Sequence, residues 1–289
     1  MCAAANPTEP GPIVGVDFTC APTPRKPQTL AFGRISAGPA ASQRTTMLRI
    51  DRIERHPSFE PFDRWLNSGP WVAGFDFPFG LPRDFVDACG WREHGPDAWA
   101  AITRRIAALE RSALVAACRD YCARRPAGSK LAHRATDGPA GSSPSMKWVN
   151  PPVAQMLHAG APRLVAAGVT VPGLRDGDPA RIALEAYPGL LARDVLGRRS
   201  YKSDDRRKDD ALRRDARRDL VAALERGRHR FGIAVDFGDW REPCIADPMA
   251  DLLDAVLCAV QAAWGWQRRD ANWGLPQRDD RTEGWIVGA

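Results

Sequence analysis

The chain has 289 residues, of which 44% are hydrophobic and 26% are charged, and this composition excludes wholesale disorder. Its formal net charge is 41 − 35 = +6, which permits an anionic partner such as nucleic acid, although an arginine-rich composition can also arise from genome bias. No apolar run is long enough to span a bilayer and the N-terminus lacks the pattern of a signal peptide, so we expect a cytoplasmic protein with no membrane partner.

The first part of the chain predicts four strands and one short helix. Residues 13–18 form a continuous apolar run, which is typical of a central strand covered on both faces. Two more alternating segments, at 28–36 and 45–54, predict an antiparallel meander with that strand. A short helix over 59–67 is expected before a second buried strand at 71–77.

The rest of the chain is expected to be mainly helical. Apolar residues recur at helical spacing over 83–125, and another helix is expected within 152–167. The segment 126–151 between them is rich in Gly, Pro and Ser, which predicts a long loop. The remaining elements expected are a fifth strand at 181–187, a charged helix over about 204–226 and a closing helix over 247–260. This order predicts a single α/β domain over 1–289 with a helical insertion at about 83–180.

Two aspartates stand where a carboxylate is costly. Gly15-Val16-Asp17 and Gly74-Phe75-Asp76 each place an Asp at the end of an apolar strand, where a buried charge needs a partner or a metal. If the two strands are neighbours, both side chains point to the end of the sheet where open α/β sheets build their sites. The alternative is that each Asp starts a turn or caps a helix. Asp236 has a similar setting, and we interpret it as a turn residue.

The closing helix carries three more aspartates on one stripe. Asp247 precedes a proline, which is typical of a helix N-cap. Asp251 and Asp254 could belong to a solvated polar face, but the helix beyond them is apolar all round, which favours burial. A gathering of oxygen ligands selects Mg²⁺ or Mn²⁺. We therefore predict a metal site formed by Asp17, Asp76 and Asp251 or Asp254.

Other polar residues could join the site or hold a substrate. Glu185 lies near the end of the fifth strand and is either a further acidic member or an outward-facing residue. Lys202 follows that unit and could lie beside the metal. Arg134 and Lys147 belong to the 126–151 loop, which is either a substrate-gripping lid or a mobile surface loop.

Several segments together resemble a known group of proteins. The first-strand Asp17, the second-strand Asp76 and the closing Asp251-x-x-Asp254-Ala pattern resemble the ribonuclease H-like fold, and the closing helix resembles that of RuvC-type resolvases. With Asp76-Phe-Pro-Phe-Gly-Leu-Pro, Glu185-Ala-Tyr-Pro and Tyr201-Lys202, these motifs resemble a domain-of-unknown-function family described as predicted nucleases. They are spread over residues 13–263.

The resemblance implies a five-stranded mixed sheet of order 3-2-1-4-5 with helices on both faces. It also implies a catalytic metal site from Asp17, Asp76 and Asp251 or Asp254, with Glu185 as an optional member, and two-metal hydrolysis of a nucleic-acid phosphodiester. DNA, RNA and a smaller phosphodiester stay open as substrates. The alternatives are a non-catalytic nucleic-acid-binding or scaffold module of the same fold, and an actin-like ATPase or sugar-kinase relative.

Overall fold

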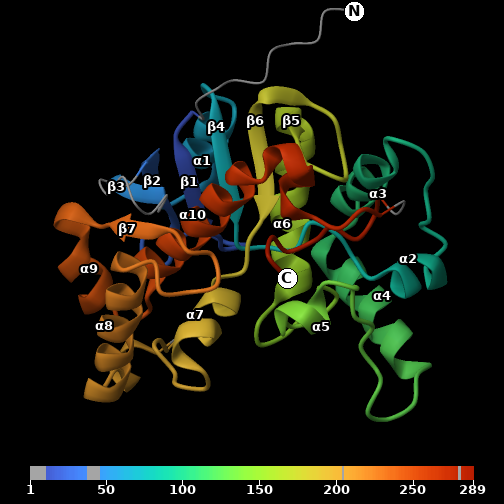
Figure 1. Ribbon diagram of the computed structural model, residues 1–289. Helices are drawn as coiled ribbons and strands as arrows, with labels where there is room; N and C mark the ends of the chain where they lie inside the picture. The colour runs from blue at the N-terminus through green and yellow to red at the C-terminus, as the bar shows by residue number, and fades with distance from the viewer. Residues whose placement is uncertain (1–10, 38–45, 204, 279–280) are drawn as a thin grey trace, which may run out of the picture.

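The computed structural model describes residues 11–37, 46–203, 205–278 and 281–289. These residues build one mixed sheet of seven strands in the order β5-β6-β4-β1-β2-β3-β7, with helices on both sides (Figure 1). The strands are β1 Ile13–Asp17, β2 Gln28–Ala37, β3 Thr46–His56, β4 Trp71–Phe75, β5 Val169–Thr170, β6 Asp178–Glu185 and β7 Ala234–Asp236.

The α/β class is confirmed, but the predicted five-stranded sheet is wrong for the sheet as a whole. The five expected segments are neighbours in the order β3-β2-β1-β4-β6, and β5 and β7 extend the sheet at its two edges. These edge strands have only two and three residues, too few to give a periodic pattern in the sequence. At the centre, β1 pairs parallel with β4 and antiparallel with β2, while β4 pairs parallel with β6.

Ten α-helices are described in the residues that the structure covers. They are α1 Phe59–Leu66, α2 Arg83–Ala88, α3 Ala98–Ala107, α4 Arg111–Ala123, α5 Asp137–Ala140, α6 Val153–Ala167, α7 Pro188–Leu196, α8 Ala211–Glu225, α9 Arg241–Ala246 and α10 Asp251–Gln267. The expected helical region at 83–125 is divided among α2, α3 and α4, and these lie on the opposite side of the molecule from α8 and α9 (Figure 1).

The alternation of side chains along the strands builds two separate apolar cores. Ile13 of β1 and Val72 of β4 pack with α7, α8 and α10. Val14 and Val16 of β1 and Phe75 of β4 pack on the opposite face, with α1, α3, α4 and α6. The helices between β4 and β5 therefore complete the second core rather than stand apart from the sheet.

Glycines in the two central strands let α10 approach the sheet closely. A Cβ at Gly15 would lie 1.9 Å from the carbonyl oxygen of Ala255, and one at Gly74 would lie 2.4 Å from that of Cys258. The backbone of α10 thus packs directly on β1 and β4, which no residue with a side chain would permit. Asp17 and Asp76 lie two residues beyond these glycines, so both face the helix.

Three other expectations concern the start of the closing helix, the N-terminal segment and membrane-spanning helices. The closing helix begins at Asp251 rather than at Asp247; Asp247 instead accepts backbone hydrogen bonds from Met249 at 3.3 Å and Leu252 at 3.2 Å. The N-terminal residues 1–7, which lack the pattern of a signal peptide, lie outside the described residues. Within the described ranges, no helix is both long and apolar enough to cross a bilayer.

Candidate functional site

The site is centred on two carboxylates at one end of the sheet. Asp17 is the last residue of β1, and Asp76 directly follows the neighbouring parallel strand β4. Both residues are half-buried, and no hydrogen bond or ion pair holds either side chain within the described part of the chain. Burial raises the pKa of Asp76 to about 7. Burial also raises the pKa of Asp17 well above its ordinary value, and the charges of Asp254 and Asp251 raise it further.

The N-terminal turn of α10 carries two more carboxylates. Asp251 and Asp254 are 8% and 1% exposed, so they lie inside the protein rather than on a solvated face. Burial raises the pKa of Asp251 to about 6, with the charges of Asp247 and Asp254 as further causes. Because both aspartates act electrostatically on Asp17, the structure brings this part of the predicted acid cluster together.

One lysine supplies a positive charge inside this cluster. Lys202 forms an ion pair with Asp254, and the hydroxyl of Tyr201 donates to the other oxygen of the same carboxylate at 2.6 Å. Burial opposes the charge of Lys202, but Asp254 raises its pKa well above the ordinary value, and Asp17 and Asp76 add to this effect. The expected place of Lys202, beside the acids, is therefore where the structure puts it.

A fully buried arginine fixes the segment that carries Tyr201 and Lys202. The guanidinium of Arg217, on α8, donates to the carbonyl of Tyr201 at 2.8 Å and to that of Ile245 at 2.7 Å. Asp209 balances its charge through bonds of 2.9 and 3.1 Å. Arg217 thus ties the segment before α8 to α9, which ends shortly before α10 and its two aspartates.

The donor set fits a divalent cation held by few protein ligands. Among the described residues, no three or more His, Cys, Asp or Glu side chains are arranged as a ready metal cage. Mg²⁺ does not require such a cage, because it usually binds one or two carboxylates and completes its shell with water and substrate phosphate. Asp17 and Asp76 are two such carboxylates, and neither has a partner in the part of the chain that the structure describes. Thr29, which pairs with Asp17 on β2, adds a buried hydroxyl that has no partner among the described residues and could bond a water.

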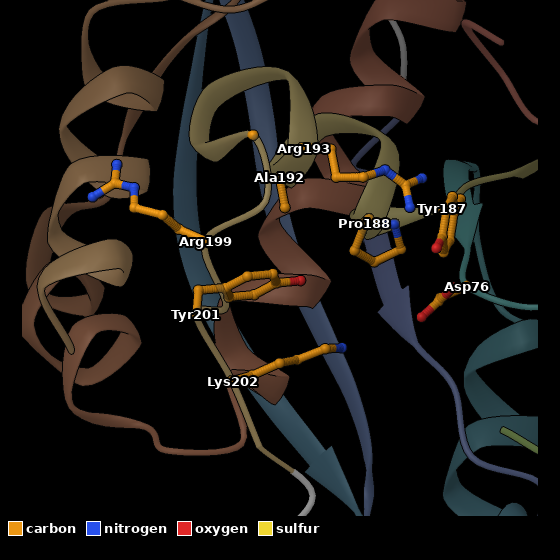
Figure 2. Close-up of a pocket in the computed structure, with 10 residues that line it drawn as sticks. Asp76, Tyr187, Pro188, Ala192, Arg193, Arg199, Tyr201 and Lys202 are labelled. Carbon is orange, nitrogen blue, oxygen red and sulfur yellow. The ribbon is translucent and has the colours of Figure 1, made fainter. Parts of the chain in front are cut away.

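A cavity of about 230 Å³ opens beside Asp76 and is lined mainly by cations and small residues (Figure 2). The side chains of Tyr201 and Lys202 point toward the part of the cavity where Asp76 lies, and Arg193 lies across from them near Tyr187 (Figure 2). Arg199 points away and pairs with Asp219 at 2.7 Å. Arg193 bonds the carbonyl of Ala140 and has no carboxylate partner within the described ranges. The cavity therefore offers positive charge to an anion next to a pair of carboxylates.

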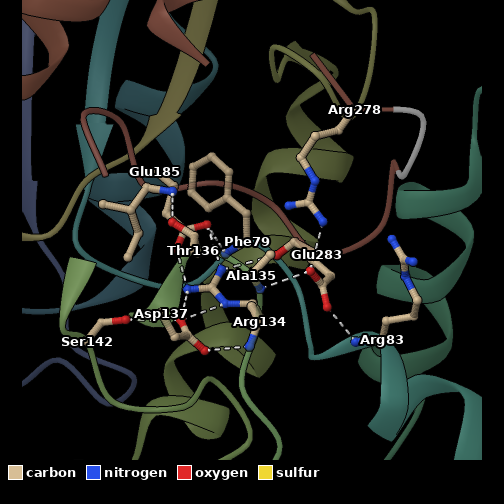
Figure 3. Close-up of polar contacts among 11 residues, drawn as sticks. Phe79, Arg83, Arg134, Ala135, Thr136, Asp137, Ser142, Glu185, Arg278 and Glu283 are labelled. Atoms are coloured by element: carbon tan, nitrogen blue, oxygen red, sulfur yellow. Dashed lines mark hydrogen bonds and ion pairs between the residues drawn. The ribbon is translucent and has the colours of Figure 1, made fainter. Parts of the chain in front are cut away.

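Glu185 and Arg134 are placed in a buried network of their own (Figure 3). Arg134 bonds the two oxygens of Glu185 at 2.7 and 2.9 Å and is held on its other side by Asp137 at 2.9 Å. The backbone N–H of Phe79 also donates to Glu185, at 3.0 Å. All three charged residues are at most 3% exposed. Glu185 is thus committed to an ion pair instead of being open to a metal, and Arg134 is enclosed instead of being open to a substrate.

The same network holds the C-terminal segment. Glu283 accepts from the backbone N–H of Arg83 at 2.7 Å, from that of Ala135 at 3.2 Å and from the guanidinium of Arg278 at 3.1 Å (Figure 3). Its carbonyl accepts from Arg134 at 3.1 Å. Part of the 126–151 loop is therefore packed between β6 and the end of the chain, whereas a lid would need to be free to move.

The remaining sequence candidates lie away from the cluster. Lys147 is half-buried in the same loop and does not line the cavity. Asp236 ends the edge strand β7 and accepts a hydrogen bond from Gly238 at 3.0 Å, as expected of a turn residue. Sequence reasoning missed the roles of Arg193, Tyr201 and Arg217. In the sequence, Tyr201 is marked only by the Tyr201-Lys202 motif of the resemblance, and no local pattern marks an arginine that acts across the fold.

Comparisons of the chain with protein-family models, with curated proteins and with solved structures gave no match.

Proposed function

We propose that this protein is a metal-dependent phosphodiesterase of ribonuclease H-like fold that acts on nucleic acid. The observation that carries the proposal is the pair of half-buried carboxylates, Asp17 and Asp76, at the ends of neighbouring parallel strands. Neither has a side-chain partner among the described residues, and Asp76 lines a cavity that also contains Arg193 and Lys202. The mixed sheet, in which β1 and the parallel strand β4 lie side by side and carry Asp17 and Asp76 at the same end, supports the proposal.

The carboxylates of the site would hold a metal ion, and its basic side chains would bind the phosphate of the substrate. Asp17 and Asp76 would hold Mg²⁺ or Mn²⁺, which supplies Lewis acidity and activates water for attack on a phosphodiester. Lys202 and Arg193 would bind the phosphate oxygens and orient the group for in-line attack. Asp251, whose pKa is about 6, is mostly ionised near neutral pH and could accept a proton from the attacking water.

The kinase or ATPase alternative receives less support from the connection between β1 and β2. Such proteins need free backbone N–H groups after the first Asp to hold phosphate. Here the side chain of Gln28 bonds both the N–H of Thr19, at 2.8 Å, and its carbonyl, at 2.7 Å. The N–H of Thr19, two residues after Asp17, is therefore already satisfied and not free for a phosphate.

Cleavage assays with matched variants test the proposal. Labelled single- and double-stranded DNA and RNA, and a small chromogenic phosphodiester, are incubated with Mg²⁺, Mn²⁺ or EDTA. We expect cleavage of at least one substrate that EDTA stops and that Asp17→Asn lowers at least a hundredfold, because a metal ligand is lost. Asp236→Asn is the control, since it alters a strand-end aspartate far from the site. Binding without cleavage would favour the scaffold alternative, and equal rates for wild type and Asp17→Asn would refute the proposal.

A further inference from the structure

Asp254 differs from the other carboxylates of the cluster because both of its oxygens are already engaged. The hydroxyl of Tyr201 donates to one oxygen at 2.6 Å, and the ammonium of Lys202 forms an ion pair with the other. The carboxylate is 1% exposed. A metal ion could reach it only by displacing a buried hydroxyl and by approaching a fixed positive charge.

The ammonium of Lys202 acts on the whole cluster and not only on Asp254. Its charge opposes the effects of burial on Asp17, Asp76 and Asp251 alike. Its segment is fixed from two sides, because Arg217 bonds the carbonyl of Tyr201 at 2.8 Å and the N–H of Ser203 donates to the carbonyl of Pro248 at 3.3 Å. Lys202 therefore pairs with Asp254 on a segment that the fold holds in place, and its ammonium also acts electrostatically on the other three aspartates, although its side chain is 43% exposed.

We propose that the site binds a single divalent cation, on Asp17 and Asp76, and that Lys202 takes the place that a second metal ion has in a two-metal hydrolase. This inference rests on the proposed function. It replaces the two-metal arrangement that the sequence resemblance implies with one metal ion and one ammonium group.

The charges of the cluster agree with this arrangement. When all four carboxyls are ionised, as a bound cation would favour, they and the ammonium leave three negative charges, and one divalent cation reduces these to one. A second divalent cation on Asp254 would make the site positive and would stand beside the ammonium that pairs with this carboxylate, where the two like charges would repel. Removing the ammonium would instead leave Asp254 and Asp251 as a second pair of carboxylates that lack a cation.

The number of bound ions tests the inference without any activity measurement. Wild type is titrated with Mn²⁺ alone, and the free ion is counted from its electron paramagnetic resonance signal. We expect one Mn²⁺ per chain in wild type and two in Lys202→Met, which keeps the length of the side chain and removes its charge. Lys202→Arg keeps the charge and should bind one ion. Lys208→Met, which removes an exposed lysine outside the cluster, should also bind one.

The outcomes separate this inference from the function on which it rests. Two ions in wild type, both weakened by Asp17→Asn, would overturn the single-ion site and leave a metal-dependent function intact. No ion in wild type would overturn both. One ion in folded Lys202→Met would overturn the role given to Lys202. If Lys202→Met does not fold, the wild-type count and Lys202→Arg still decide, because two ions in either protein contradict the inference.

Discussion

Replacing Asp76 by asparagine should stabilise the metal-free protein, and the gain should depend on pH. Asp76 has an ordinary pKa of 3.8, and burial in the folded state raises it to about 7. Between these values the folded state holds more protons than the unfolded state, so stability falls as the pH rises. Each pH unit of difference corresponds to about 1.4 kcal/mol, so the ionised carboxyl costs the fold up to about 4 kcal/mol above pH 7.

The assay is urea unfolding in EDTA at pH 4 and at pH 8. Asp76→Asn keeps the shape of the side chain and removes the ionisation, so it should match wild type at pH 4 and exceed it by up to about 4 kcal/mol at pH 8. Saturating Mn²⁺ should narrow this gap, because a hundredfold excess over the dissociation constant adds about 2.7 kcal/mol to a protein that binds it only when folded. Asp236→Asn, at an exposed strand end, is the control and should show neither effect.

The opposite result would identify Asp76 as a structural residue. If Asp76 instead caps a turn, its replacement should lower the free energy of unfolding by about 1 kcal/mol, at any pH above the ordinary pKa of an aspartate and with or without metal. A destabilised Asp76→Asn in EDTA at pH 8, with no effect of Mn²⁺ on wild type, would refute the reasoning.

Three further predictions concern the packing, the cavity and the buried network. Gly15→Ala should lower the free energy of unfolding by about 3 kcal/mol or more in urea titrations, because its Cβ would meet the backbone of α10. A Cβ at Gly138 meets nothing within 4 Å, so Gly138→Ala is the control and should be nearly neutral. Equal effects of the two variants would contradict the close approach of α10. Arg193→Ala should weaken the binding of a labelled oligonucleotide about tenfold, measured by fluorescence anisotropy in EDTA. Arg198 does not line the cavity, so Arg198→Ala is the control and should bind as wild type does. Unchanged binding by Arg193→Ala would show that the cavity does not hold the nucleic acid. Arg134→Met should lower the free energy of unfolding by about 3–5 kcal/mol in thermal or urea unfolding, because Glu185 and Asp137 lose their counter-charge. Adding Glu185→Gln to this variant should restore part of the lost stability. No restoration would mean that the network acts only by packing.

The placement of Asp17 and Asp76 at the ends of neighbouring strands, and the burial of Asp251 and Asp254, could be predicted from the sequence because their signals are local. A glycine two residues before each strand-end aspartate marks both the close packing of α10 and the face on which Asp17 and Asp76 lie. An apolar helix that begins with Asp251 and Asp254 indicates buried carboxylates, and both are buried. Each of these patterns fits within one strand or one helix.

The parts that sequence reasoning placed differently depend on contacts between distant segments. Glu185 and Arg134 are 51 residues apart, and no pattern in either segment indicates that they form an ion pair. The partners of Asp254 come from a segment 53 and 52 residues earlier. Long-range pairing of this kind is decided by the packing of the whole fold, so the ligands free for a metal could not be separated from those already engaged.

The position of bound Mn²⁺ in a crystal of the protein tests the central claim most directly. Anomalous diffraction from crystals soaked in Mn²⁺ should show the ion between the carboxylates of Asp17 and Asp76, and Asp17→Asn crystals soaked in the same way should lack it. An ion bound elsewhere, or no ion at a concentration that shifts the thermal unfolding of wild type, would contradict the assignment of these two aspartates as the metal site.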